Sequence, residues 1–149
     1  MPPAAAPPVL PGAAPAVDLA PGHPAAGAGP LAQAAEDGRR AAAVGLDWPD
    51  AAGVLDKIAE ELAELRVAVA GGDPADITHE LGDLLLSAVS LGRHTGVSAE
   101  NALETANLRF RRRFAAVVAR AEAGGVPLGA RPPEERERLW ADVKAMESR

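Results

Sequence analysis

Two long segments in the middle of the chain carry apolar side chains at helical spacing. In residues 51–70 one side of a helix would hold Val54, Ile58, Leu62, Leu65 and Val69. In residues 74–95 the corresponding stripe is Ile77, Leu81, Leu84, Ala88 and Leu91. Only the short stretch "GGDP" separates the two segments. The pattern therefore predicts two amphipathic helices that pair as an antiparallel hairpin.

Capping residues define where these helices begin and end. Asp50 and Asp73 stand where N-caps are expected, and Pro74 follows Asp73 at the first helical position. Gly96 is suited to end the second helix, and Ser98 to begin another. Each end of the predicted hairpin thus has its own sequence signal.

Three further segments also have helical patterns, and no strand alternation competes with them. They are a short helix over residues 31–43, a helix from Ser98 to about residue 124, and a last helix within "PPEERERLWADVKAMESR". The predicted core stripe of the long helix after Ser98 is Leu103, Phe110, Phe114 and Val117. The expected fold is all-α, a bundle of about five helices around the central hairpin.

The second helix of the hairpin is apolar around most of its circumference. Its apolar residues include Leu84, Leu85, Leu86, Val89 and Leu91. A helix of this kind needs neighbours on several sides, which one short chain supplies poorly. We therefore expect a homodimer or a higher homo-oligomer with a four-helix-type core.

The first 30 residues differ in composition from the rest. They hold nine of the chain's 14 prolines and only one charged side chain, Asp18. Proline at this density breaks helices, so residues 1–30 are expected to be a disordered Pro/Ala-rich tail and residues 31–149 the folded domain. No basic stretch precedes an uninterrupted apolar run, which argues against a signal peptide.

Composition narrows the possible functions. The net charge of −6 argues against a nucleic-acid surface. The chain has no cysteine, which excludes thiolate metal sites and cysteine nucleophiles and fits a cytoplasmic location. No segment approaches the roughly 20 apolar residues that span a bilayer, so no membrane association is expected.

Acidic residues gather along one flank of both hairpin helices. At about 100° per residue, Glu61 lies roughly 60° and Glu64 roughly 120° from the centre of the first apolar stripe, with Lys57 between them and Glu60 turned outward. On the second helix, Glu80 and Asp83 share a flank.

The hairpin can therefore bring Glu61, Glu64, Glu80 and Asp83 to one point, where a divalent cation would relieve their repulsion. Oxygen-only ligands favour Mg²⁺, with Mn²⁺ as a possible substitute. The alternative is an ordinary solvated acidic face on a non-catalytic dimerisation or regulatory module. The apolar residues around Asp83 favour the metal site.

The long fourth helix offers cations for a phosphorylated substrate. Arg109 and Arg113, four residues apart, share one flank. Two arginines near a metal would neutralise a triphosphate. Asn107 falls on the predicted core stripe, where it would either bind substrate or satisfy a helix junction.

Several stretches in fixed order resemble the MazG family of nucleoside triphosphate pyrophosphohydrolases. They are "VGLDWPDAAGVLDKIAEELAEL", "ELGDLLLSAVSLGRHTGVSAENAL", "ANLRFRRRF" and the later "LWADVK". The resemblance covers residues 31–144. The chain departs from the family at Arg109, where Lys is common, at Leu46, where Phe is common, and in having one such domain where longer members have two.

The resemblance implies an all-α, usually dimeric enzyme that uses Mg²⁺ to cleave nucleoside triphosphates to monophosphate and pyrophosphate, a reaction suited to nucleotide-pool housecleaning. It implies that Glu61, Glu64, Glu80 and Asp83 are catalytic metal ligands. The residues that it implies for substrate binding are Lys57, Asn107, Arg109, Arg113, Trp140 and Lys144. A more specific pyrophosphohydrolase, acting on dUTP, dCTP or phosphoribosyl-ATP, remains the alternative within the same scaffold class.

Overall fold

The computed structural model describes residues 28–147, which form five α-helices and one 3-10 turn, with no strand among them. The elements are α1 Pro30–Ala43, α2 Ala51–Gly71, α3 Pro74–Thr95, α4 Ala99–Ala123, η1 Leu128–Ala130 and α5 Pro133–Glu147. The all-α class and all five predicted helices are confirmed. Of the predicted tail, residues 1–27 lie outside the described part of the chain.

The helices begin and end at the predicted capping residues. Asp50 Oδ1 accepts a hydrogen bond from Gly53 N at 2.9 Å, and Asp73 Oδ1 accepts one from Ala75 N at the same distance. Ser98 Oγ caps α4 through Asn101 N at 3.2 Å. α3 ends at Gly96, whose φ of 72° lies in the left-handed region. Glycine is favoured there because it has no Cβ to clash.

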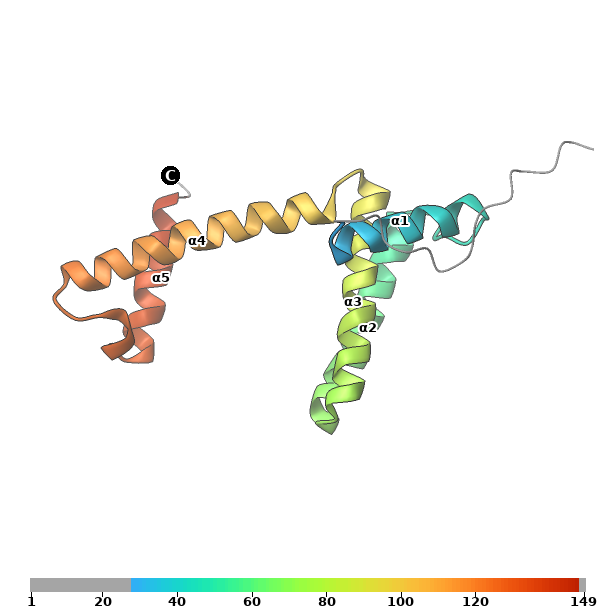
Figure 1. Ribbon diagram of the computed structural model, residues 1–149. Helices are drawn as coiled ribbons and strands as arrows, with labels where there is room; N and C mark the ends of the chain where they lie inside the picture. Colours follow the sequence, from blue (N-terminus) through green and yellow to red (C-terminus); the bar gives the residue numbers. More distant parts are fainter. Residues whose placement is uncertain (1–27, 148–149) are drawn as a thin grey trace, which may run out of the picture.

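The molecule consists of a helical hairpin, formed by α2 and α3, and an arm, formed by α4 and α5 (Figure 1). α2 and α3 pack along each other as the predicted hairpin, and α1 lies across the end where α3 passes into α4. α4 touches α1 and α3 near this junction and then leads away from the hairpin to pack against α5. The five helices therefore do not close into a single bundle within one chain.

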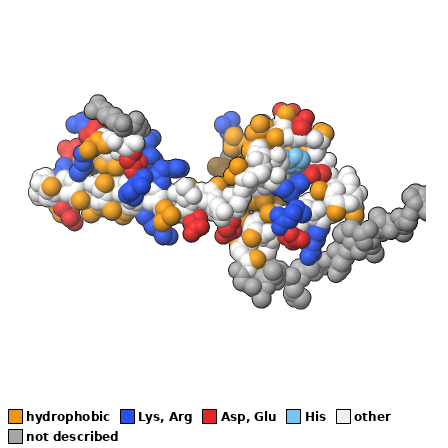
Figure 2. Space-filling view, turned by 90° about the horizontal axis from the view of Figure 1, so that it is seen from above, with side chains coloured by type: hydrophobic (Ala, Val, Ile, Leu, Met, Phe, Trp, Pro, Cys, Tyr) orange, Lys and Arg blue, Asp and Glu red, His pale blue; other side chains and the backbone are white. Residues whose placement is uncertain are grey.

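The interior of a single chain is small, and the predicted core stripes are only partly right. Among the described residues, the buried apolar side chains are Val54, Val89, Val117, Ala121 and Val143. The predicted core residues that are instead exposed are Leu62, Val69, Leu81, Ala88, Leu103, Phe110 and Phe114. Figure 2 shows hydrophobic side chains open to the surface over the arm as well as over the hairpin. These apolar stripes exist, but one chain leaves them uncovered.

An ionic lock holds the loop before α2 against the end of α3. Arg93 donates to both carboxylate oxygens of Asp47, at 2.6 and 2.5 Å, and His94 Nε2 lies 3.0 Å from Asp47 Oδ1. The hydrogen bonds from Arg93, above all, hold the pKa of Asp47 well below its ordinary value. A bidentate pair of this kind fixes orientation as well as charge. The lock therefore sets where the chain enters α2, the helix that carries Glu61.

Asp47→Asn is expected to lower the melting temperature at pH 7 and to make stability less sensitive to acid. Because the folded-state pKa lies below that of the unfolded chain, about 3.9, the stabilisation is present above that pH and is lost as the pH falls below it. Thermal melts followed by circular dichroism at pH 7 and pH 3 measure both effects. Asp37→Asn in α1 is the control, and equal acid sensitivity in the two variants would contradict the role of the lock.

Arg131 fastens the connection between α4 and α5. Its guanidinium donates to the carbonyl oxygens of Ala121 and Val126, at 2.9 and 3.0 Å, and to Glu135 at 3.1 Å. Carbonyls at the end of a helix lack intrahelical partners, so the Ala121 contact satisfies one of them. A Cβ on Gly124 would lie 2.7 Å from Arg131 Nη2, so a larger residue there would require this guanidinium to shift.

Arg131→Ala is expected to destabilise the arm by about 1–3 kcal/mol, because it leaves a helix-end carbonyl and a loop carbonyl without their donor. Urea unfolding of the full chain measures the change. Arg136→Ala on the exposed surface of α5 removes the same charge and should shift stability little. Equal losses in the two variants would show that charge alone matters.

Candidate metal and nucleotide site

Three carboxylates meet between the hairpin helices. Glu61 and Glu64 come from α2 and Glu80 from α3, and each offers an oxygen within 4.8 Å of the others. Glu61 is buried, Glu64 is exposed and Glu80 is intermediate. The antiparallel pairing of α2 and α3 thus produces most of the predicted cluster, and this cluster could hold a metal ion.

Glu61 is the buried centre of the cluster. Its side chain is 5% exposed, and its Oε1 lies 2.8 Å from Lys57 Nζ. Its Oε2 has no hydrogen-bond partner among the described residues. An unpaired carboxylate oxygen in a buried position is costly and rare. This oxygen is therefore available for a ligand.

Lys57 and Glu64 show how crowded the acidic flank is. Lys57 Nζ also reaches Glu60 Oε1 at 2.9 Å, so one ammonium group bridges two neighbouring carboxylates. Hydrogen bonds to Glu61 and Glu60 raise the pKa of Lys57 above its ordinary value. Partial desolvation and then the charge of Glu61 raise the pKa of Glu64. A bound cation would relieve this repulsion.

Asp83, the fourth predicted ligand, lies outside the three-carboxylate cluster. Its side chain is 41% exposed, and its Oδ2 lies 3.5 Å from Nε2 of His79, one turn earlier on α3. Its surroundings are thus more open than the apolar sequence around it suggests. Glu60 is exposed, as predicted, with 57% of its side chain accessible.

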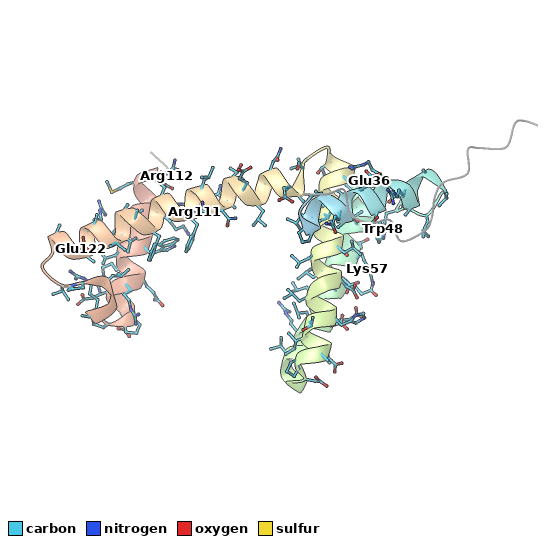
Figure 3. All side chains as sticks on the ribbon, viewed as in Figure 1. Glu36, Trp48, Lys57, Arg111, Arg112 and Glu122 are labelled. Atoms are coloured by element: carbon cyan, nitrogen blue, oxygen red, sulfur yellow. The ribbon has the colours of Figure 1, made fainter. Side chains whose placement is uncertain are left out.

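The predicted substrate-binding residues of α4 lie on the arm. Asn107 and Arg109 are exposed, so the expectation that Asn107 sits in a core stripe is wrong for the single chain. Arg113 donates to Glu147 Oε2 at 2.5 Å and so ties α4 to the end of α5. In Figure 3, Lys57 on the hairpin lies well apart from Arg111 and Arg112 on the arm. One chain does not bring these cations to the carboxylates.

The predicted substrate-binding residues near the C-terminus, Trp140 and Lys144, lie on the same arm. Trp140 packs against Phe110 with ring centroids 5.6 Å apart, and Phe110 stacks on Phe114 at 6.1 Å. Lys144 lies in the last turn of α5. Trp140 and Lys144 therefore share the arm with Arg109 and Arg113.

Sequence reasoning missed three features of this region. It placed Lys57 between Glu61 and Glu64 but did not anticipate its ion pair with Glu60. It did not find Glu147 as the partner of Arg113 or Asp47 as the partner of Arg93. The last two contacts join residues 34 and 46 positions apart, which leave no signal in local periodicity, whereas the i,i+3 spacing of Lys57 and Glu60 is itself a signal for their ion pair. Within residues 28–147, no helix combines the length and the apolar character needed to cross a membrane.

Comparisons with known proteins point to one chemical class. The family model described as phosphoribosyl-ATP pyrophosphohydrolase matches residues 46–110, which include all four predicted metal ligands. The chain is 41% identical over 113 residues to the nucleoside triphosphate pyrophosphohydrolase of Escherichia coli K12, covering 73% of this chain and 42% of that protein. It is 40% identical over 119 residues to the nucleoside triphosphate pyrophosphohydrolase/pyrophosphatase MazG of Thermotoga maritima, covering 77% of this chain and 46% of that protein.

The chain thus spans less than half the length of these relatives. The matched region contains the whole α2–α3 hairpin and most of the first half of α4. The resemblance first seen in separate motifs therefore extends continuously through the carboxylate cluster. On these matches, the chain is similar to MazG-like nucleoside triphosphate pyrophosphohydrolases over the region that carries the carboxylate cluster.

Proposed function

We propose that this protein hydrolyses nucleoside triphosphates to nucleoside monophosphate and pyrophosphate with Mg²⁺, as a nucleotide-pool housecleaning enzyme. The observation that carries the proposal is the buried carboxylate of Glu61, which clusters with those of Glu64 and Glu80 and whose Oε2 has no partner among the described residues. The relatives named nucleoside triphosphate pyrophosphohydrolase support the same reaction class.

The donor set fits a hard divalent cation. Three carboxylates within 4.8 Å of one another offer only oxygen, which suits Mg²⁺ or Mn²⁺. Glu61, Glu64 and Glu80 would hold the ion, with Asp83 on the same flank of α3 as the further ligand. When bound, such an ion polarises phosphoryl oxygens and makes water a better nucleophile. Lys57, released from Glu61, would contact a phosphate oxygen.

The separation of the arm from the hairpin supports a homodimer. A triphosphate needs cations beyond the metal, and the best candidates, Arg109 and Arg113, lie on the arm. We propose that the arm of one copy completes the site of the other. The exposed Phe110 and Phe114 give the arm an apolar face for that contact.

Phosphoribosyl-ATP hydrolysis is the second candidate, because the matching family model carries that description. Both reactions release pyrophosphate and need the same metal-binding carboxylates. The difference lies in how the nucleoside end of the substrate is held. The named relatives favour nucleoside triphosphates.

A pyrophosphate-release assay tests the proposal. The purified full chain is incubated with the eight common ribo- and deoxyribonucleoside triphosphates and with phosphoribosyl-ATP, with MgCl₂ or with EDTA. Metal-dependent release of pyrophosphate from triphosphates is expected. Hydrolysis of phosphoribosyl-ATP alone would establish the second candidate. No turnover of any substrate would overturn the enzymatic proposal in favour of a binding or regulatory module.

Asp83→Asn is expected to lower metal-dependent turnover by at least about 100-fold, because even residues that only support metal ligands often contribute 10–100-fold. The fold should survive, since Asp83 is partly exposed and, among residues 28–147, pairs only with His79. Turnover and the Mg²⁺-dependent rise in melting temperature measure the effect. His79→Ala is the control, and a loss of the same size in that variant would show that the His79–Asp83 pair matters rather than a metal ligand.

A further inference from the structure

A hollow of about 480 Å³ lies directly beside the carboxylate cluster on the α2–α3 hairpin. Glu64 and Glu80 of the cluster form part of its wall, and Val67 and Ala68 of α2 give it an apolar lining. Gly71 and Asp76 also line it, at the turn of the hairpin. The volume lies within the range of about 300–1,000 Å³ that is usual for small-molecule sites. The proposed phosphate site therefore continues into a space with a partly apolar lining.

We propose that this hollow holds the nucleobase of the substrate and that Asp76 selects bases presenting two adjacent N–H donors, as guanine does. The inference rests on the proposed triphosphate hydrolysis and assigns its base specificity. It also rests on Glu61, a buried member of the same cluster as the two glutamates in the wall of the hollow, whose Oε2 has no partner among the described residues.

The dimensions suit a nucleotide laid along α2. Gly71 follows Glu64 by seven residues, which at 1.5 Å per residue corresponds to about 10 Å. Phosphates at the glutamates would thus place the ribose and base toward the turn. The apolar side chains of Val67 and Ala68 in the wall can pack against a base ring.

Asp76 is the polar group that would read the base edge. It is exposed, and no hydrogen bond or ion pair engages its side chain within residues 28–147. An ionised carboxylate only accepts hydrogen bonds. The N1–H and 2-amino groups of guanine offer two parallel donors, whereas adenine places an acceptor nitrogen beside its amino group. Asp76 therefore favours the guanine edge and repels the adenine edge.

A structural role for Asp76 is the competing explanation. Asp76 lies in the first turn of α3, where an acid interacts favourably with the helix dipole. That role would change stability but would treat all nucleotides alike. Specificity is thus the readout that separates the two explanations.

The test compares kcat/KM for GTP and ATP in the full-length protein with MgCl₂. Asp76→Asn is expected to lower the GTP-to-ATP ratio by about tenfold, the value of one hydrogen bond to a charged group, because an amide matches the adenine edge better. Asp73→Asn is the matched control. It removes the same charge at the same helix end, preserves an N-cap and lies outside the hollow. Its ratio should equal that of the wild type.

Equilibrium binding gives a second readout that needs no turnover. The dissociation constants of the α,β-methylene analogues of GTP and ATP, measured by calorimetry, should change in ratio like the kinetic values. Ala68→Leu, which fills the hollow, should weaken both analogues alike. Unchanged affinity in Ala68→Leu, or an unchanged ratio in an active Asp76→Asn, overturns this inference alone. A wild-type protein that hydrolyses no triphosphate overturns the proposed function and this inference with it.

Discussion

Replacing Glu61 with glutamine is expected to abolish metal-dependent hydrolysis while leaving the hairpin folded. Glu61 is the most buried acid of the cluster, and its Oε2 has no partner in the described chain. Glutamine keeps the shape but removes the charge that attracts a divalent cation. Turnover should fall by at least about 100-fold, and the rise in melting temperature on adding MgCl₂ should disappear.

The effect of Glu61→Gln on the melting temperature should differ between the metal-free and the metal-bound protein. Burying a carboxylate oxygen without a partner costs free energy, so Glu61→Gln should melt no lower than the wild type in EDTA. Glu60→Gln is the matched control, since Glu60 is the adjacent acid, bonds the same lysine and is largely exposed. Near wild-type turnover in Glu61→Gln, or equal inactivation of Glu60→Gln, would contradict the assignment of Glu61 as the central ligand.

The second large effect is expected at the uncovered flank of the hairpin. Exposed apolar side chains recur along it: Leu55, Leu62, Val69, Leu81 and Leu85. At about 100° per residue, Leu62 lies about 160° from Glu64 around α2, and Leu81 lies as far from Asp83 around α3. The apolar flank is thus opposite the acidic flank. A second copy packed on it would bury these leucines and leave the carboxylates accessible.

Leu85→Glu is expected to turn a dimer into a monomer and to reduce turnover with it. A charge at the centre of an apolar interface should weaken association by about 2 kcal/mol or more. Light scattering coupled to size exclusion at low micromolar concentration should give twice 15.2 kDa for the wild type and 15.2 kDa for the variant. Val44→Glu, which places the same charge at an exposed apolar residue outside the hairpin, should remain dimeric. A monomeric wild type would overturn the dimer and leave the arm without a role in a shared site.

Helix boundaries could be predicted from sequence because their causes are local. Asp50, Asp73 and Ser98 cap the backbone within three residues of themselves, and Gly96 ends α3 through its own φ angle. The acidic flank could be predicted for the same reason, since helical geometry relates residues three or four apart. Such local features can be recognised in the sequence without knowledge of the tertiary structure.

The interior could not be predicted as well, because a helical stripe does not say what covers it. Leu62 and Val69 repeat with Val54 as core residues would, yet they are exposed in the single chain. Glu61, placed on a flank by that stripe, is buried against α3 because the real contact face is centred closer to it. The Asp47–Arg93 lock joins residues 46 positions apart, a distance over which periodicity carries no information.

The ion pair between Lys57 and Glu61 would make binding of a metal ion to the cluster a competition between two cations. A tethered ammonium group already contacts one oxygen of the central carboxylate, at 2.8 Å. A divalent ion would find Oε2 open but would compete with this ammonium group for the negative charge of the same carboxylate, and Glu60 could retain the lysine at 2.9 Å. The affinity for the metal ion then depends on how much more strongly the Glu61 carboxylate attracts the ion than it attracts Lys57. This competition favours moderate affinity and rapid release of the ion over permanent occupancy. The flank also never carries its full negative charge uncompensated, so the hairpin can fold before any ion arrives.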